Sequence, residues 1–441
     1  MTKKRLVVLL EGQIAGDLTE TDGQLAFTYD DAYREQPDPT PLSLSVPIAV
    51  KHHSGVHVKN FLWGLLPDNA RVLERWAVRF ETTAGSVFGL ISGVGEDCAG
   101  AVQFVRAERL SELSAETPPL PADEAWIAGR LREVRRDAAA WHATSGARSE
   151  GNWSLAGAQP KFALAWDQDR WVRPTGTSAT THIFKPNTSG FVHFDVNEFL
   201  CLATARQLGL PAAFAEVREF EDERVLVVQR YDRTDTNTRI HQEDLCQAMG
   251  VHPERKYQND MGPSVESVRT RLDERLDSDQ SDLVADQFMR SLAFHWLVLN
   301  TDGHAKNFSL LLAGSMVRLA PLYDVASACI HQRTTPGNPE LGELRSSGLR
   351  LALSIGGEYE ANKTKDANWR TCARHLRLDE ERVATTVREM AEGLPAAMEA
   401  ASAQLPEGLA DDFADRFVEL VVQRSTRCTQ LLDTKTARSR R

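Results

Sequence analysis

The segment NTDGHAKNFS, residues 300–309, gathers a carboxylate, two amides, an imidazole and an ammonium group directly after a long apolar run. Within it, Asp302 and Asn307 have the spacing D-x-x-x-x-N. A loop of that span directs a carboxylate at an attacking hydroxyl and an amide oxygen at a metal ion, the arrangement used for phosphoryl transfer. A polar turn after a buried helix fits the same residues, because Asp and Asn are common in turns.

Asp324, in PLYDVAS, supports the chemical interpretation. It follows Asn307 by seventeen residues, and a hairpin between them would return Asp324 to the loop. Because Mg²⁺ prefers one or two carboxylates together with phosphate oxygens, Asp324 and Asn307 are candidate metal ligands. His304 and Lys306 lie between Asp302 and Asn307, where they could meet phosphate charge. The alternative role for Asp324 is to cap a following helix.

A second group of residues suits nucleotide binding. Gly157 and Ala158, in SLAGAQPKFAL, predict a tight turn whose backbone N–H groups approach phosphates, although a plain hairpin fits equally well. Lys185 ends the predicted strand THIFKP, where it could pair with phosphates, and Glu198 opens the next predicted helix and could pair with Lys185. A surface ion pair is the alternative for both residues. VVQRYDR, residues 227–233, ends another predicted strand and would be the hinge that reads the adenine edge.

The order of these elements is that of a kinase: a glycine turn, a strand lysine, a helix glutamate, a hinge, the D-x-x-x-x-N loop and a final aspartate. Residues 5–110 are predicted to be β-rich, residues 153–231 to form a sheet interrupted by one helix, and helical periodicity dominates from about 242. We therefore predict an α+β, two-lobed, protein-kinase-like fold with a β-rich N-terminal part and an all-helical C-terminal part. The predicted domains are 1–110, β-rich; 111–149, linker and helix; 150–235, nucleotide-binding β subdomain; and 236–441, helical catalytic lobe.

Composition narrows the class of protein. The 441 residues carry 51 Lys and Arg against 62 Asp and Glu, a net charge of −11, which disfavours general nucleic-acid binding. Two basic stretches, 370–377 and 435–441, are exceptions for which a solvated face and a frayed terminus are the alternatives. The six cysteines form no C-x-x-C motif, and no uncharged apolar run reaches the roughly 20 residues of a membrane span. We expect reduced thiols, a cytoplasmic location and no membrane contact.

Several motifs together resemble one known family. LAGAQPKFAL, THIFKP, NEFLCL, QRYDR, TDGHAKNFS and PLYD look like HipA, the serine/threonine kinase toxins of bacterial type II toxin–antitoxin modules. PLSLSVP, FLWGLLPDN and GAVQFV resemble the N-terminal domain of that family. The resemblance covers roughly residues 5–400. The D-x-H-x-x-N core is also similar to the catalytic loop of phosphoinositide kinases, so a phosphoinositide-kinase-like fold is implied.

The resemblance implies an activity and partners. Family members transfer phosphate from ATP, with Mg²⁺, to protein hydroxyls, and their reported targets are aminoacyl-tRNA synthetases, typically the glutamyl enzyme. The modification halts translation and growth and promotes persistence. A HipB-like helix-turn-helix antitoxin is the implied partner, through which the pair would bind operator DNA as a co-repressor. Arg370, Arg374 and Arg377 are then candidates for contact with the DNA backbone.

The resemblance also implies roles for single residues. Asp302 would be the catalytic base, and Asn307 and Asp324 would hold Mg²⁺. Ser154 occupies the autophosphorylation position, where a phosphate adds about −1.5 to −2 charge and would eject the phosphate loop. The implied ATP-binding residues are Ala156, Gly157, Ala158, Gln159, Pro160, Lys161, Lys185, Gln229, Arg230, Tyr231, His304, Ala305, Lys306, Asn307, Tyr323 and Asp324.

Two positions depart from the family pattern. Pro160 stands where an acidic residue often precedes the lysine, and Gln229 stands where Glu is common. Because proline lacks an N–H donor, the phosphate contacts of this loop stay open. Two other functions also stay open: a kinase of the same fold that acts on a small molecule or lipid, and a non-catalytic pseudokinase that acts as a co-repressor.

Overall fold

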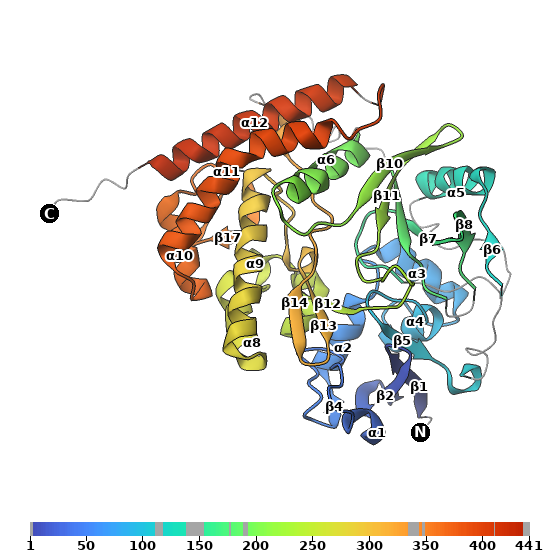
Figure 1. Cartoon of the computed structure of the whole chain (residues 1–441). Helices are drawn as coiled ribbons and strands as arrows, with labels where there is room; N and C mark the ends of the chain where they lie inside the picture. The colour runs from blue at the N-terminus through green and yellow to red at the C-terminus, as the bar shows by residue number, and fades with distance from the viewer. Residues whose placement is uncertain are drawn as a thin grey trace. The chain divides into compact units, whose positions relative to one another are not determined.

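The computed structural model describes residues 3–110, 118–137, 154–175, 178–187, 193–333, 344–345, 349–409 and 411–434. The chain divides into two compact units, called unit one and unit two below (Figure 1). Unit one comprises Met1–Pro186, Arg218–Glu254 and Ser309–Val317, and unit two comprises Asn187–Val217, Arg255–Phe308 and Arg318–Arg441. The predicted boundary between 235 and 236 falls inside unit one, and the four-part division stays a prediction. The predicted basic tail 435–441 lies outside the described residues.

Unit one begins with an antiparallel five-stranded sheet in the order β4-β3-β2-β1-β5. Its strands are β1 (Lys4–Leu10), β2 (Gln13–Thr21), β3 (Gln24–Tyr29), β4 (His52–Ser54) and β5 (Val102–Val105). Strand β1, which lies between β2 and β5, is apolar on both faces: Leu6, Val8 and Leu10 join the main core, whereas Val7 and Leu9 pack with a smaller apolar cluster. The N-terminal apolar run is therefore a strand, as predicted from the sequence.

Four helices accompany this sheet in unit one, namely α1 (Asp31–Arg34), α2 (Val56–Gly64), α3 (Ala70–Arg79) and α4 (Val87–Val94). The motif FLWGLLPDN ends α2 and leads into α3, as its Pro and Asp predict. Asn69 caps α3 by accepting a hydrogen bond from the N–H of Arg71. Residues 65–69 connect the two helices in a compact turn, and this turn contacts the candidate phosphate loop and Ser154.

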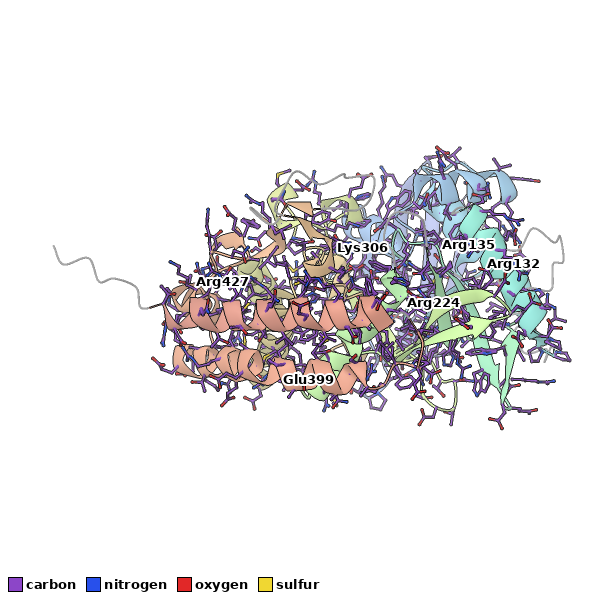
Figure 2. All side chains as sticks on the ribbon, turned by 90° about the horizontal axis from the view of Figure 1, so that it is seen from above. Arg132, Arg135, Arg224, Lys306, Glu399 and Arg427 are labelled. Carbon is purple, nitrogen blue, oxygen red and sulfur yellow. The ribbon has the colours of Figure 1, made fainter. Side chains whose placement is uncertain are left out.

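A second sheet carries the predicted nucleotide-binding strands, in the order β10-β11-β9-β7-β8-β6. Its strands are β6 (Leu120–Pro121), β7 (Phe162–Asp167), β8 (Arg170–Arg173), β9 (His182–Pro186), β10 (Ala215–Phe220) and β11 (Glu223–Gln229). Figure 2 labels Arg132 and Arg135, two residues of helix α5 (Glu124–Arg136). Both side chains pair with Glu223, the first residue of β11. The helix predicted within 111–149 is thus confirmed as Glu124–Arg136; residues 138–153 are not described.

A third, three-stranded sheet adjoins the candidate catalytic loop in the chain. It consists of β12 (His241–Asp244), β13 (Ser309–Ala313) and β14 (Met316–Leu319), followed after β12 by the short helix α7 (Leu245–Met249). The motif PLSLSVP holds β12 in place: Ser43 Oγ donates to Glu243 Oε2 at 2.5 Å, and the N–H of Leu44 donates to Glu243 Oε1 at 2.8 Å. β13 begins two residues after Asn307, so the loop leads directly into this strand.

Unit two is mainly helical. Its helices are α6 (Phe194–Gln207), α8 (Val265–Arg275), α9 (Ser278–Leu297), α10 (Asp366–Leu376), α11 (Glu380–Ser402) and α12 (Asp411–Asp433). Two short strand pairs interrupt them, β15 (Gln332–Arg333) with β16 (Leu344–Arg345) and β17 (Arg350–Ile355) with β18 (Glu358–Glu360). Helices α11 and α12 lie side by side (Figure 1). The C-terminal part is therefore helix-rich rather than wholly helical, and within the described ranges no helix is both long and apolar enough to cross a bilayer.

Candidate active site

The loop from Asn300 to Asn307 begins where α9 ends. The last turn of α9 is buried, and the chain reverses at Leu299, whose φ is +56°. The side-chain amide of Asn307 donates to the carbonyl of Asp302 at 2.9 Å, and the N–H of His304 donates to the same carbonyl at 2.7 Å. Residues 303–307 are buried, whereas Asp302 is exposed. The loop is a compact turn that leaves its one carboxylate accessible.

A buried histidine of α9 holds the start of this loop. Asn300 Nδ2 donates to His295 Nδ1 at 2.8 Å, and Asn300 Oδ1 accepts from the N–H of Asp302 at 3.0 Å. Burial lowers the pKa of His295 to about 4, so the ring is neutral near pH 7 and Nδ1 can accept. A Cβ at Gly303 would lie 2.8 Å from His295 Nδ1, so the close approach requires glycine. The sequence does not predict this role of His295, because nothing in the composition of the helix distinguishes the residue from its neighbours.

Asp324 reaches the same loop through its neighbour. Tyr323 Oη donates to the carbonyl of Lys306 at 2.6 Å, which joins the segment after β14 to the residue that precedes Asn307. Asp324 has a φ of +55°, a left-handed conformation that is uncommon outside glycine and is often found at functional sites. The predicted hairpin is confirmed as β13 and β14. That Asp324 and Asn307 hold Mg²⁺ stays a prediction that these contacts support.

Residues 256–264, which the sequence does not predict as part of the site, also contact the loop. Tyr257 Oη donates to Asp302 Oδ1 at 2.5 Å, and the N–H of Ala305 donates to the carbonyl of Lys256 at 3.1 Å. The ring of Tyr257 packs edge-on against His304, with 5.1 Å between ring centroids. The segment KYQNDMGPS contains no recognisable catalytic motif, so the sequence alone does not predict its role in the site.

The candidate phosphate loop, residues 156–161, lies just after Ser154 and precedes β7 in unit one. Gly157 has a φ of +104°, and a Cβ there would lie 2.7 Å from Lys161 Nζ. Lys161 Nζ donates to the carbonyl of Ala156 at 2.9 Å, so the loop curls around its own lysine. Of the other predicted contacts, Pro160 is buried, Ala158 is exposed and Gln159 is half-buried. The tight turn is confirmed, and its contact with phosphate stays a prediction.

The N-terminal domain motif FLWGLLPDN packs against this loop. The N–H of Asp68 donates to the carbonyl of Gly157 at 3.1 Å, and Ser154 Oγ donates to the carbonyl of Leu65 at 2.7 Å. The N–H of Ser154 donates to the carbonyl of Asp97 at 2.8 Å. Ser154 is fully buried, so it could accept a phosphate only after the start of the loop had left this position.

The predicted hinge divides into residues with different surroundings. Gln229 is exposed at the end of β11, opposite His182 of β9, and Lys185 is buried in β9 opposite Leu226. Tyr231 Oη donates to the side chain of Gln242. Glu198 is fully buried in α6 of unit two. The pairing of Lys185 with Glu198 stays a prediction.

The side chain of Arg230 has a structural role that the sequence does not predict. Its guanidinium donates to both carboxylate oxygens of Asp232, at 2.9 and 2.7 Å, and to the carbonyl of Cys98 at 2.9 Å. Its N–H donates to the carbonyl of Thr181 at 2.9 Å. Because the donors of Arg230 are engaged in this way, a nucleotide contact from this residue would fall to its carbonyl oxygen.

Asp97 is the second carboxylate of this buried network. Asp97 Oδ1 accepts from Arg233 at 2.9 Å and from Arg239 at 3.0 Å, and Asp97 Oδ2 accepts from Thr180 Oγ1 at 2.7 Å. Burial raises the pKa of Asp97, but Arg239, Arg233 and Arg230 outweigh burial and hold that pKa below its ordinary value. The network joins the N-terminal domain to the chain on either side of the predicted hinge.

The three arginines proposed for DNA contact are all paired within unit two. Arg370 pairs with Asp366 at 2.6 Å and with Glu381 at 2.6 Å, Arg374 pairs with Glu380 at 2.7 Å, and Arg377 pairs with Asp273. Each guanidinium would have to leave a carboxylate to reach a phosphate. The α10 surface is thus less basic than its sequence suggests, and the DNA contact stays an untested prediction.

The candidate catalytic loop and its surroundings offer few side chains that could hold Mg²⁺. Among the described residues, no three or more His, Cys, Asp or Glu side chains gather in a way that could hold a metal ion. A Mg²⁺ ion bound with a nucleotide does not need such a group, because phosphate oxygens and water complete its coordination. One carboxylate, Asp324, and one amide oxygen, Asn307, fit that requirement once a nucleotide is present.

Comparisons with known proteins cover nearly the whole chain. Residues 153–398 match a family described as the HipA-like C-terminal domain, and residues 6–105 match the HipA N-terminal domain. The chain is 30% identical over 411 residues to "Putative kinase Y4mE" of Sinorhizobium fredii, covering 90% of this chain and 93% of that protein. It is 26% identical over 438 residues to "Serine/threonine-protein kinase toxin HipA" of Shewanella oneidensis, covering 96% of this chain and 94% of that one.

A solved structure has the same fold. The structure of the "Shewanella oneidensis MR-1 Toxin Antitoxin System HipA, HipB and its operator DNA complex" matches 97% of this chain and 98% of its own, with a TM-score of 0.81 and 24% identity. The predicted combination of a β-rich N-terminal part with a helix-rich C-terminal part is confirmed by this match.

Proposed function

The chain belongs to the HipA family, and on that basis we propose that it is a serine/threonine protein kinase that transfers the γ-phosphate of ATP to a protein hydroxyl. One observation carries the proposal. The exposed carboxylate of Asp302 belongs to a loop that also contains Asn307, and Tyr323, the residue before Asp324, donates a hydrogen bond to that loop. This is the group of side chains that phosphoryl transfer needs from the protein.

The chemistry follows from these side chains. Asp302 accepts the proton of the acceptor hydroxyl while that oxygen forms a bond to the γ-phosphorus, and the bond to the ADP oxygen breaks. Bound Mg²⁺ would neutralise charge on the phosphate oxygens, and Asn307 and Asp324 are the residues that would hold it. Lys161 and Lys185 would meet phosphate oxygens, and the exposed Gln229 and the backbone beside it would meet the adenine edge.

The family also suggests a partner and a substrate class. A relative with the same fold has been solved with HipB and its operator DNA, so we propose a HipB-like antitoxin as the partner and operator DNA as a target of the pair. We propose an aminoacyl-tRNA synthetase, such as the glutamyl enzyme, as the substrate, with arrest of growth and persistence as the outcome. Autophosphorylation of Ser154 belongs to the same proposal, and it requires the loop to leave Leu65 and Asp97.

A direct experiment separates a protein kinase from its alternatives. The wild-type chain and the Asp302→Asn variant are each expressed briefly, and phosphorylated proteins are compared by mass spectrometry. Glu392→Gln, at an exposed carboxylate on α11, is the matched control. We expect new phosphoserine or phosphothreonine with the wild type and with Glu392→Gln and none with Asp302→Asn. No new phosphoprotein but equal growth arrest with all three would favour a non-catalytic co-repressor. Phosphorylated metabolites in the same extracts that depend on Asp302, without new phosphoproteins, would favour a small-molecule kinase.

A further inference from the structure

Asp302 is held by a residue outside its own loop. Tyr257 Oη donates to Asp302 Oδ1 at 2.5 Å, although 45 positions separate the two residues in the chain. Tyr257 is half-buried and Asp302 is exposed, so the hydroxyl reaches the carboxylate from the protein side and leaves the carboxylate accessible to a substrate. A hydroxyl that donates to a carboxylate both fixes its rotation and favours its charged form.

The backbone that carries Tyr257 is itself tightly fixed. The carbonyl of Tyr257 accepts from the N–H groups of Asp260 and Gly262, each at 3.0 Å. A Cβ at Gly262 would lie 2.1 Å from the carbonyl oxygen of Arg255, so only glycine allows this close turn. On its other side, Gln258 exchanges hydrogen bonds with Ser354 of β17, at 2.8 and 3.0 Å. Such a rigid support suits a residue that positions another one.

The same segment also touches the middle of the catalytic loop. The carbonyl of Lys256 accepts from the N–H of Ala305 at 3.1 Å, and the Tyr257 ring packs against His304. Two adjacent residues therefore fix the loop at Asp302, His304 and Ala305. Packing alone would be satisfied by a phenylalanine ring, whereas the bond to Asp302 requires the hydroxyl.

We infer that Tyr257 is a positioning residue for the general base Asp302: its hydroxyl fixes the rotation of the carboxylate that accepts the proton. The inference rests on the proposed function, because it assigns Tyr257 a task in the same phosphoryl transfer. The hydroxyl proton stays on Tyr257 throughout, and the proton of the acceptor hydroxyl goes to Asp302. In this role Tyr257 acts through Asp302 and not directly on ATP or the acceptor.

The test uses the full-length protein, γ-labelled ATP and Mg²⁺, and measures total release of the labelled phosphoryl group to protein and to water over a series of ATP concentrations. The variants are Tyr257→Phe, Asp302→Asn and their combination. Tyr359→Phe is the matched control, because it makes the same chemical change in unit two at a tyrosine whose ring packs on Arg350.

Removal of the hydroxyl should act on turnover and not on ATP binding. We expect Tyr257→Phe to lower kcat by about 10- to 100-fold, the loss of one hydrogen bond to a charged group, with an unchanged KM for ATP. In the Asp302→Asn background, Tyr257→Phe should cause no further loss.

Each contrary result has a definite meaning. If Tyr257→Phe behaves like Tyr359→Phe, or lowers turnover equally in the Asp302→Asn background, the positioning role is wrong and the proposed kinase stands. Reduced turnover together with a raised KM for ATP would show a merely structural tyrosine. If wild type and Asp302→Asn release the same label, the proposed function fails first, and the inference fails with it.

Discussion

Arg233 Nη2 lies 2.9 Å from Asp97 Oδ1, and both side chains are buried. Asp97 follows α4 of the N-terminal domain, whereas Arg233 follows the predicted hinge, so the ion pair joins two segments that match separate family descriptions. The N-terminal domain is therefore part of the framework of the nucleotide-binding strands in unit one, not an appended module.

Loss of the Asp97 charge should destabilise the protein. Asp97→Asn removes the charged partner that Arg233 and Arg239 share, although Arg233 keeps its pair with Asp232, and breaking a buried pair in this way costs about 3–5 kcal/mol. The free energy of unfolding, measured by urea denaturation, should fall by that amount, whereas Glu108→Gln at an exposed carboxylate should leave it unchanged. A stability equal to that of the wild type would show that the network contributes no net stabilisation.

Gly157 should be required for nucleotide binding. Gly157→Ala imposes a side chain at φ +104° and places a Cβ 2.7 Å from Lys161 Nζ, so the candidate phosphate loop must rearrange. Strain of this kind costs about 1–3 kcal/mol, which predicts roughly a 5- to 150-fold weaker affinity for a fluorescent ATP analogue. Gly129→Ala, on α5 with no atom near the added Cβ, is the matched control and should bind the analogue as the wild type does. Equal affinity of the Gly157→Ala variant would remove the loop from the nucleotide site.

Ser154 should report on the position of the phosphate loop. Its hydroxyl is buried against the carbonyl of Leu65, a place where a phosphate cannot be accommodated without moving the chain. We expect incubation with ATP to add one phosphate at Ser154, detected by intact mass and peptide mapping, and we expect Ser154→Glu to bind the ATP analogue more weakly than Ser154→Ala. Ser154 that stays unmodified while other proteins become phosphorylated would contradict this regulation.

Stability should fall in mild acid because of two buried histidines. Burial lowers the pKa of His241 and of His295 from 6.5 to about 4, so between these values the unfolded chain binds protons that the folded chain does not. Stability is therefore complete above pH 6.5 and declines as the pH falls toward 4, by roughly 2 kcal/mol per histidine at pH 5. The measurement is urea denaturation at pH 7 and pH 5.

A histidine substitution tests the same prediction more directly. In His295→Gln the difference in unfolding free energy between pH 7 and pH 5 should shrink by about 2 kcal/mol. His57→Gln, at an exposed position on α2, should leave that difference as it is in the wild type. A difference that does not shrink in His295→Gln would mean that this histidine does not titrate on unfolding.

The sequence by itself determined the features that depend on near neighbours in the chain. The D-x-x-x-x-N spacing, the break between α2 and α3 at Pro67, the turn at Gly157 and the hairpin before Asp324 follow from local backbone preferences, which a few consecutive residues set. The agreement of several such motifs was enough to indicate the family and the fold.

Only the tertiary structure decided which partner each charged or polar side chain has. The sequence predicts Arg230 as a hinge residue, but folding places its side chain against Asp232 and Cys98. The sequence predicts no role for Tyr257, which folding places on Asp302. The physical reason is that a hydrogen bond depends on distance in space, to within about 3 Å, whereas the sequence records only distance along the chain. Partners separated by 45 or 136 positions leave no local pattern by which either could be recognised.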